Sequence, residues 1–249
     1  MDLFKLCMAY GQFRAKERWI ALDAIRGIIF LGMVLYHLLF DLVFFKEYPV
    51  ELYTGFWYWM ARSIAGSFLF IAGISLVLSD SRLSLRHRFG HHMKRGFQIL
   101  GAGILITVVT MNLFPENTIW FGILHAIALC IILFWPLTRH PKRAGAAALI
   151  VLVIIALLPS LSYASPWLIW FGFPPAGFQS FDYVPLIPWS LPFLLGISTA
   201  PILLSKLPKA QRSLRNHVLA RSLAWFGRRT LVGYLIHQPI LVSLVLMLA

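Results

Sequence analysis

Long apolar segments dominate this chain and restrict it to one class of fold. Seven of them have the length and apolarity of membrane-spanning helices: residues 19–42, 56–79, 96–113, 119–137, 144–160, 185–204 and 229–248. The 249 residues are 59% hydrophobic and only 12% charged, with a mean hydropathy of +0.78. A soluble domain of this size does not need so much apolar surface. We therefore predict an all-α integral membrane protein in which residues 1–249 form a single transmembrane domain.

The basic residues predict the orientation of these spans. Of the 22 lysines and arginines, all except Arg26, Lys46 and Arg62 fall in residues 1–18, 80–95, 138–143 and 205–229. These four segments alternate with the spans, so the positive-inside rule places the N-terminus in the cytoplasm and the C-terminus outside. We therefore attribute the net charge of +13 to the needs of membrane insertion and to contact with anionic lipid. We predict no nucleic-acid partner.

The connecting segments carry further predictions. Residues 1–18 are expected to form an amphipathic cytoplasmic lead-in, and the first apolar run is too long for a cleaved signal segment. Residues 80–95 form a basic, histidine-rich loop, and residues 205–228 form a basic loop that is predicted to be helical. The proline-rich and aromatic outer segment 160–185 predicts a short surface helix or half-helix.

Neither cysteines nor loop histidines predict a metal site. Cys7 falls on the cytoplasmic side and Cys130 inside a span, so the two do not pair. His87, His91 and His92 have no carboxylate near them in the sequence, and we expect them to face solvent. Small residues in the second span, Gly66, Ala72 and Gly73, predict close helix packing.

The first span carries a polar stripe in the run LDAIRGIIFLGMVLYHLLFDL. At about 100° per residue, Arg26 and His37 differ by about 20° around the helix, and Asp23 and Asp41 lie within about 60° of them. Asp23 and His37 are about 21 Å apart along the axis. Charged residues inside a membrane helix are costly, so they usually mark a function or a partner.

Five ionisable residues fall in the outer half of the membrane or at its outer surface: His37, Asp41, Arg62, His125 and Asp182. His37 and Asp41 are four residues apart on one helix, so their side chains can touch. A carboxylate that orients an imidazole and raises its basicity suits a general base. Arg62 stays charged, so it needs Asp41, Asp182 or a substrate anion. We predict that His37, Asp41, Arg62 and His125 are catalytic.

Each of these residues also has a structural interpretation, which the sequence leaves open. Arg62 can pair with Asp41 and join two helices. His37 can be a hydrogen-bonded packing residue, and His125 can bond a neighbouring carbonyl.

A second polar group is predicted towards the cytoplasm and consists of Asp23, Arg26 and His237. Lys94 and Arg95 end the basic loop before the third span and can hold a phosphate-bearing donor. We predict that these five residues bind the donor. Alternatively, Asp23 and Arg26 neutralise each other at three-residue spacing, and Lys94 and Arg95 only set the topology.

Several motifs resemble a family of membrane-embedded acyltransferases. LDAIRG, followed by His37 fourteen residues after Asp23, is similar to the first span shared by acyltransferase-3 O-acetylases and the heparan-alpha-glucosaminide N-acetyltransferase catalytic family. RSIAGSFLFIAGISLVLS, FGILHAIAL, DYVPLIPW and GRRTLVGYLIHQPIL look like short bacterial members of the latter family. The resemblance runs from about Arg18 to Leu246. The lysosomal member carries its catalytic histidine in a loop after the first span, and residues 42–61 here contain no histidine.

The resemblance implies an acetyl-CoA-dependent acyltransferase of the bacterial inner membrane. It implies transfer of an acetyl or other acyl group from cytoplasmic acyl-CoA to an envelope glycan or lipid-linked sugar on the outer face. Membrane lipids are implied partners, a homo-oligomer is left open, and no metal is implied. By this resemblance, His37 is the general base or acetyl carrier and Asp41 orients it. The remaining roles are oxyanion stabilisation or acceptor binding for Arg62 and His125, and CoA binding for Asp23, Arg26, Lys94 and Arg95.

Two other functions compete with this interpretation. The same charges suit a proton or substrate relay in a transporter or lipid-handling protein, although no inverted repeat is visible. They also suit a structural membrane protein whose polar residues only join helices.

Overall fold

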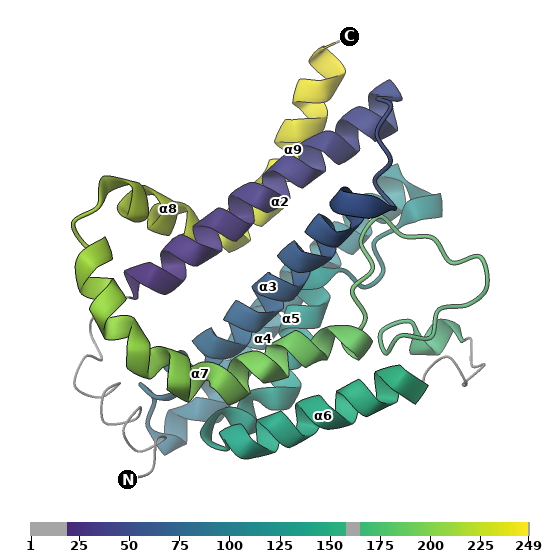
Figure 1. Ribbon diagram of the computed structural model, residues 1–249. Coiled ribbons are helices and arrows are strands. Elements are labelled where there is room, and N and C mark those ends of the chain that lie inside the picture. Colours follow the sequence, from purple (N-terminus) through teal and green to yellow (C-terminus); the bar gives the residue numbers. More distant parts are fainter. Residues whose placement is uncertain (1–18, 158–164, 249) are drawn as a thin grey trace. The chain divides into compact units, whose positions relative to one another are not determined.

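The computed structural model consists of helices joined by shorter connections (Figure 1). It describes residues 19–157 and 165–248, and for residues 206–213 the backbone alone. The α-helices are α2 (Ile20–Lys46), α3 (Gly55–Asp80), α4 (Leu85–Leu113), α5 (Ile123–Phe134), α6 (Pro141–Leu157), α7 (Leu186–Leu214), α8 (Val218–Arg228) and α9 (Thr230–Met247). Short 3-10 helices lie at Pro115–Asn117 (η1), Trp135–Arg139 (η2) and Pro166–Leu168 (η4). The described residues contain no β-strand, so the predicted all-α class is confirmed.

Five helices are long and apolar enough to cross a membrane, where seven spans were predicted. They are Ile20–Lys46, Gly55–Asp80, Leu85–Leu113, Leu186–Ser205 and Thr230–Met247. The other two predicted spans also contain helices, α5 of 12 residues and α6 of 17. At about 1.5 Å per residue α5 is about 18 Å long, short of a hydrocarbon core of about 30 Å, and the described part of α6 is about 26 Å long. Pro136 lies two residues after the last residue of α5, in η2, and disfavours continuation of the α-helix.

Three connecting segments differ from their predictions. Residues 85–95 are the first turns of α4 and not a loop, because the helix begins directly after Ser84. The described part of the outer segment, 165–185, holds the single 3-10 turn η4 and no half-helix. The predicted helix in 205–228 is present as the end of α7 and all of α8. The predicted lead-in 1–18 lies outside the described residues.

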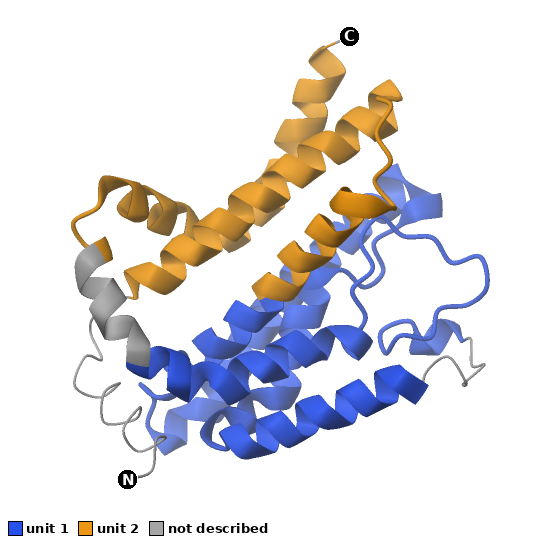
Figure 2. Cartoon of the chain, in the orientation of Figure 1, with its two compact units in different colours: residues 1–16, 69–205 blue, residues 17–68, 206–249 orange. Residues whose placement is uncertain are grey.

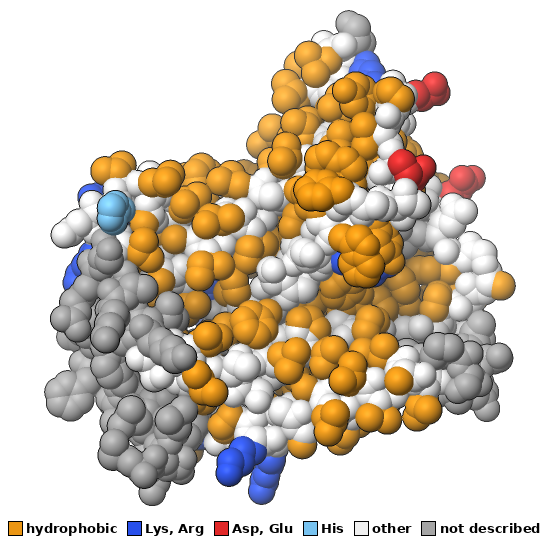
Figure 3. Space-filling view, in the orientation of Figure 1, with side chains coloured by type: hydrophobic (Ala, Val, Ile, Leu, Met, Phe, Trp, Pro, Cys, Tyr) orange, Lys and Arg blue, Asp and Glu red, His pale blue; other side chains and the backbone are white. Residues whose placement is uncertain are grey.

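Hydrophobic side chains cover much of the surface, as lipid-facing helices require. Figure 3 shows them over most of the described face, with few charged groups among them. Large apolar residues are exposed on the middle of several helices, such as Leu35 on α2, Val153 on α6 and Ile240 on α9. In water so much apolar surface would be unfavourable, whereas acyl chains solvate it well. The protein is therefore an integral membrane protein.

The chain divides into two compact units (Figure 2). Unit 1 contains residues 1–16 and 69–205, and unit 2 contains residues 17–68 and 206–249. The long helices α3 and α7 each contribute to both units. The two units are described separately below.

Helices α3 and α7 cross tightly in unit 1. A Cβ atom on Gly73 would collide with the backbone of Phe193, and one on Gly196 would collide with the backbone of Phe70. Glycine is therefore required for the two backbones to approach this closely. The predicted packing role is confirmed for Gly73 and is wrong for Gly66, where a Cβ would meet nothing within 4 Å.

One end of unit 1 is joined by a buried ionic cluster around Asp80, which sequence reasoning did not single out. Arg88 Nε and His92 Nε2 donate to Asp80 Oδ1 at 2.6 and 2.9 Å, and Arg139 Nε donates to Oδ2 at 3.1 Å. Asp80 and His92 are each only 1% exposed. This carboxylate thus connects α3, α4 and η2. His92 is a buried structural residue and not a solvent-facing loop residue, because α4 starts early enough to carry it inwards.

The other end of unit 1 joins the α4–α5 connection to the segment before α7. Asp182 Oδ2 accepts a hydrogen bond from Ile123 N at 2.9 Å and so satisfies a free N–H at the start of α5. A parallel bridge pairs Phe121 with Tyr183. Burial raises the pKa of Tyr183 to about 12, so its phenol stays protonated and donates to Ile169 O at 2.8 Å.

Unit 2 is built on the crossing of α2 with α8. A Cβ on Gly27 would collide with the Leu223 carbonyl, and one on Gly227 would collide with the Asp23 carbonyl. Helix α9 runs beside α2 (Figure 1), with Gly233 under the Phe30 ring. The α8 crossing therefore determines where α9 begins along α2.

We expect Gly227→Ala to destabilise the protein by about 1–3 kcal/mol, because the new Cβ must displace the α2 backbone. The measurement is thermal unfolding of the purified protein in detergent. Gly101→Ala is the matched control, since a Cβ there meets nothing within 4 Å and alanine favours the helix. Equal melting temperatures for the two variants would contradict the tight crossing.

Candidate active site

Four polar side chains meet inside unit 2, between two helices that are otherwise strongly apolar. His37 and Asp41 come from α2, and His237 and Gln238 come from α9. The two imidazole rings lie edge to face with their centres 4.9 Å apart. Gln238 Nε2 donates to Asp41 Oδ1 at 2.6 Å. We call these four residues the His37–His237 cluster.

Three polar atoms of this cluster are buried without a hydrogen-bond partner among the described residues. They are Asp41 Oδ2, His237 Nε2 and Gln238 Oε1. Leaving a buried donor or acceptor unsatisfied costs about 1–3 kcal/mol per group. Native proteins rarely tolerate several such groups together, and each one needs an explanation. All three can accept a hydrogen bond, so the cluster presents converging acceptors to any donor that reaches it.

His237 is held in one tautomer by the helix that carries it. Its Nδ1 lies 2.7 Å from the Tyr234 carbonyl oxygen. A carbonyl only accepts, so Nδ1 must carry the proton that is donated. In the neutral ring, Nε2 then has a lone pair, and this is the ring nitrogen without a partner in the described part of the chain. An oriented neutral imidazole with an available Nε2 can act as a general base or a nucleophile.

The predicted partner of Asp41 and the predicted place of His237 both need correction. Asp41 bonds Gln238 through Oδ1, and its other oxygen has no partner among the described residues, so a direct Asp41–His37 hydrogen bond is not present. His237 lies against His37 and not with Asp23, which is about 21 Å away along α2. The reason is that α9 begins only after the α8 crossing, beside Phe30, well beyond the start of α2.

The remaining predicted residues of unit 2 lie elsewhere on its helices. Asp23 and Arg26 form an ion pair with a distance of 2.9 Å between Oδ1 and Nη1. This agrees with the structural alternative of mutual neutralisation. The Arg62 guanidinium lies over the Tyr58 ring, 4.2 Å from its centre, one helical turn away on α3.

Three predicted residues belong to unit 1. Lys94 and Arg95 are exposed on α4. His125 is buried in α5, where its Nδ1 accepts from Gly122 N at 3.3 Å and its Nε2 lies 3.4 Å from Thr107 Oγ1. Both ring nitrogens of His125 therefore have partners, and the imidazole closes the start of α5.

We expect His125→Ala to reduce stability by about 1–3 kcal/mol and to leave the activity per folded molecule within about twofold, because this ring connects helices. Thermal unfolding and activity are measured on the same preparation. A large loss of activity at unchanged melting temperature would instead make His125 a catalytic residue.

Sequence reasoning missed Gln238 as a site residue. The signal was present, since Gln238 follows His237 in the apolar run YLIHQPIL. An uncharged amide in a span attracts less attention than a charge, although its desolvation also requires a partner. Pro239 comes next and cannot donate an N–H to the Leu235 carbonyl, so the helix is also locally weakened here.

No metal site accompanies the cluster in the described part of the chain. No group of three or more histidine, cysteine, aspartate or glutamate residues converges there.

The imidazole pair, the carboxylate and the amide lie inside a polytopic membrane protein whose described residues include five helices long and apolar enough to span. The family model described as heparan-alpha-glucosaminide N-acetyltransferase, catalytic, matches residues 18–239. The chain belongs to this family, which implies a membrane transferase of the acetyltransferase type. The match includes all four residues of the His37–His237 cluster. Comparisons with curated proteins and with solved structures gave no match.

Proposed function

We propose that this protein transfers an acetyl or other acyl group from cytoplasmic acyl-CoA to a sugar or glycolipid on the outer face of the bacterial inner membrane. The observation that carries the proposal is the His37–His237 cluster, in which three buried polar atoms lack partners among the described residues of a transferase-family chain. The family uses acetyl-CoA as donor, which makes an acyl thioester the donor that fits best.

The proposed orientation has the N-terminus in the cytoplasm and the C-terminus outside, as the basic residues predict. Segments that this orientation puts on the same side do meet. Arg139 bonds Asp80, and both belong to predicted cytoplasmic connections. Phe181 N donates to Asn117 O, and both belong to predicted outer connections. These contacts support the alternation of the spans within unit 1.

In the proposed reaction, the acceptor hydroxyl or amine attacks the thioester carbonyl carbon. His237 Nε2 takes the proton of the acceptor, because its lone pair is available while Nδ1 stays bonded to Tyr234. A new C–O or C–N bond forms, the C–S bond breaks, and CoA leaves as a thiolate that takes up a proton. If Nε2 attacks the carbonyl first, an acylimidazole forms, CoA leaves, and the acceptor then displaces the imidazole.

Asp41 and Gln238 are proposed to position the substrate. Asp41 Oδ2 can accept a hydrogen bond from an acceptor hydroxyl or amine, and the amide of Gln238 keeps the carboxylate in place. Gln238 Oε1 provides a second acceptor next to it. His37 packs against His237 and limits the rotation of that ring.

The proposal is tested with purified protein in liposomes that contain an extract of lipid-linked envelope sugars. Acetyl-CoA labelled in the acetyl group is supplied on one side, and label in the sugar fraction and free CoA are both measured. We expect stoichiometric release of CoA and labelled sugar. Uptake of a solute without any release of CoA would favour a transporter and contradict the transferase proposal.

A further inference from the structure

Helix α8 has the features of a helix that lies at a membrane surface. Its 11 residues extend over about 16 Å, too short to span. Ala220, Ala224 and Gly227 are buried in unit 2, whereas Val218 and Leu219 are 75% and 72% exposed. Short, strongly amphipathic helices with this division of residues lie in the interface between water and acyl chains.

The position of α8 along α2 agrees with an interfacial location. Gly227 packs on the backbone of Asp23, and Leu223 packs on Gly27, so α8 lies beside the first two turns of a membrane-spanning helix. Trp225 is partly exposed on the same helix, and tryptophan is enriched at the level of the lipid headgroups. Lipid headgroup phosphates lie at the level where a membrane-spanning helix ends, which is the level of α8.

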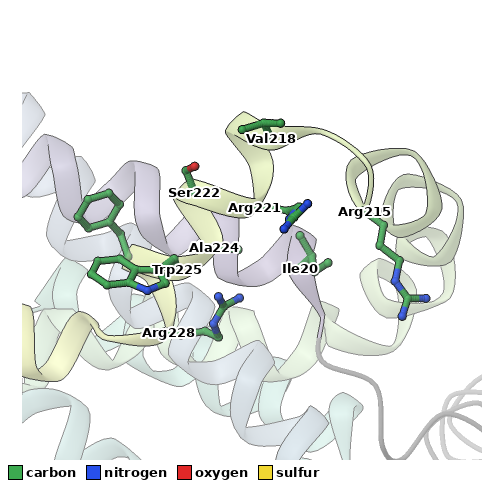
Figure 4. Close-up of a pocket in the computed structure, with 9 residues that line it drawn as sticks. Ile20, Arg215, Val218, Arg221, Ser222, Ala224, Trp225 and Arg228 are labelled. Carbon is green, nitrogen blue, oxygen red and sulfur yellow. The ribbon is translucent and has the colours of Figure 1, made fainter.

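A pocket of about 910 Å³ opens at this place (Figure 4). Among the described residues, its lining combines three arginines with apolar residues and one serine and includes no acidic residue: Ile20, Arg215, Val218, Arg221, Ser222, Ala224, Trp225, Phe226 and Arg228. Arg221 and Arg228 are seven residues apart, so they differ by about 20° around the helix. Figure 4 shows both guanidinium groups on the side of α8 that faces Ile20.

We propose that this pocket binds the phosphate of an anionic phospholipid, with Arg221 and Arg228 as its main donors. Guanidinium groups bind phosphate oxygens through paired N–H donors. The apolar lining at Ile20, Trp225 and Phe226 suits the glycerol and first acyl carbons that follow the phosphate. A fully soluble phosphate compound would not use the exposed Val218 and Leu219 beside the pocket, and this observation favours a lipid. The site is separate from the His37–His237 cluster and does not depend on the acyltransferase proposal.

The test is a lipid titration followed by native mass spectrometry of the full-length protein in detergent. The probes are dioleoylphosphatidylglycerol, dioleoylphosphatidylcholine, inorganic phosphate and CoA. For the first bound phosphatidylglycerol, we expect the Arg221→Gln/Arg228→Gln variant to bind at least tenfold more weakly than the wild type, with phosphatidylcholine unchanged. Arg221→Lys/Arg228→Lys keeps both charges but loses the paired donors, so we expect an intermediate loss.

Arg86→Gln/Arg143→Gln is the control, since both residues are exposed in unit 1 and the net charge changes equally. An equal loss in this control, or a wild type that does not distinguish the two lipids, would overturn the proposal. Displacement of phosphatidylglycerol by CoA in the wild type but not in the Arg→Gln variant would assign the pocket to a soluble nucleotide phosphate and also overturn it. If the double variant does not fold, Arg221→Gln and Arg228→Gln are titrated singly, and a loss below twofold in both contradicts the proposal.

Discussion

Replacing His237 with alanine should lower the rate of acyl transfer by about 10²–10⁴-fold, the usual contribution of a positioned general base. The reason is that the Tyr234 carbonyl holds the proton on Nδ1 of His237, which leaves a lone pair on Nε2. Nε2 also has no partner among the described residues. Because the imidazole acts on the developing charge, kcat should fall while KM for acyl-CoA changes little. The measurement is release of CoA and labelled sugar by protein in liposomes.

The control for this variant is His217→Ala, which removes an exposed imidazole just before α8. We expect it to keep the wild-type rate. His37→Ala gives the comparison that matters most, because the motif resemblance favours His37. If His37→Ala abolishes transfer while His237→Ala retains more than a tenth of the rate, the assignment of the reacting imidazole to His237 is wrong.

Asp80→Asn should destabilise the protein by about 3–5 kcal/mol, the range found when one partner is removed from a buried ion pair. Asp80 compensates the guanidinium groups of Arg88 and Arg139 and accepts from His92. An uncharged amide keeps the volume but leaves two buried or partly buried cations without a carboxylate. We expect a clear fall in the melting temperature in detergent, and a fall in yield because the variant is close to the limit of stability.

Glu116→Gln provides the matched control, since this carboxylate is exposed in η1 and its loss should change stability by less than about 0.5 kcal/mol. The loss of stability in Arg139→Gln should lie between those of Asp80→Asn and Glu116→Gln, because Asp80 keeps the Arg88 contact. An Asp80→Asn protein that melts at the wild-type temperature would show that the cluster does not hold α3, α4 and η2 together.

The membrane class and most helices could be predicted because hydropathy and helical periodicity are local properties. Residues 20–46, 55–80 and 230–247 are apolar over the length of a bilayer whatever surrounds them. Predictions at the ends of elements were weaker. The run of basic residues and histidines at 85–95 reads as a loop, yet it is helical because α4 packs on α5 and the Asp80 carboxylate binds His92 on the second turn.

Buried polar residues were easier to predict from the sequence than their hydrogen-bond partners. The cost of burying His37, Asp41, His125 and His237 is readable from the sequence, since each interrupts an apolar run. Whether such a residue is satisfied is not readable. His125 finds partners in Thr107 and Gly122, while Asp41 Oδ2 and His237 Nε2 find none among the described residues. His125 is therefore a packing residue, whereas His237 is a candidate base.

The sequence by itself determined that this chain spans a membrane, that its basic residues lie between long apolar segments, and that its motifs match a transferase family. These properties depend on composition, periodicity and order along the chain. Only the tertiary structure decided that His237 meets His37 and not Asp23, and that Asp41 meets Gln238. The register of α9 on α2 follows from the crossing at Gly27 and Gly227, where two backbones touch. A contact between residues about 200 positions apart depends on that packing, and no local pattern in the sequence encodes it.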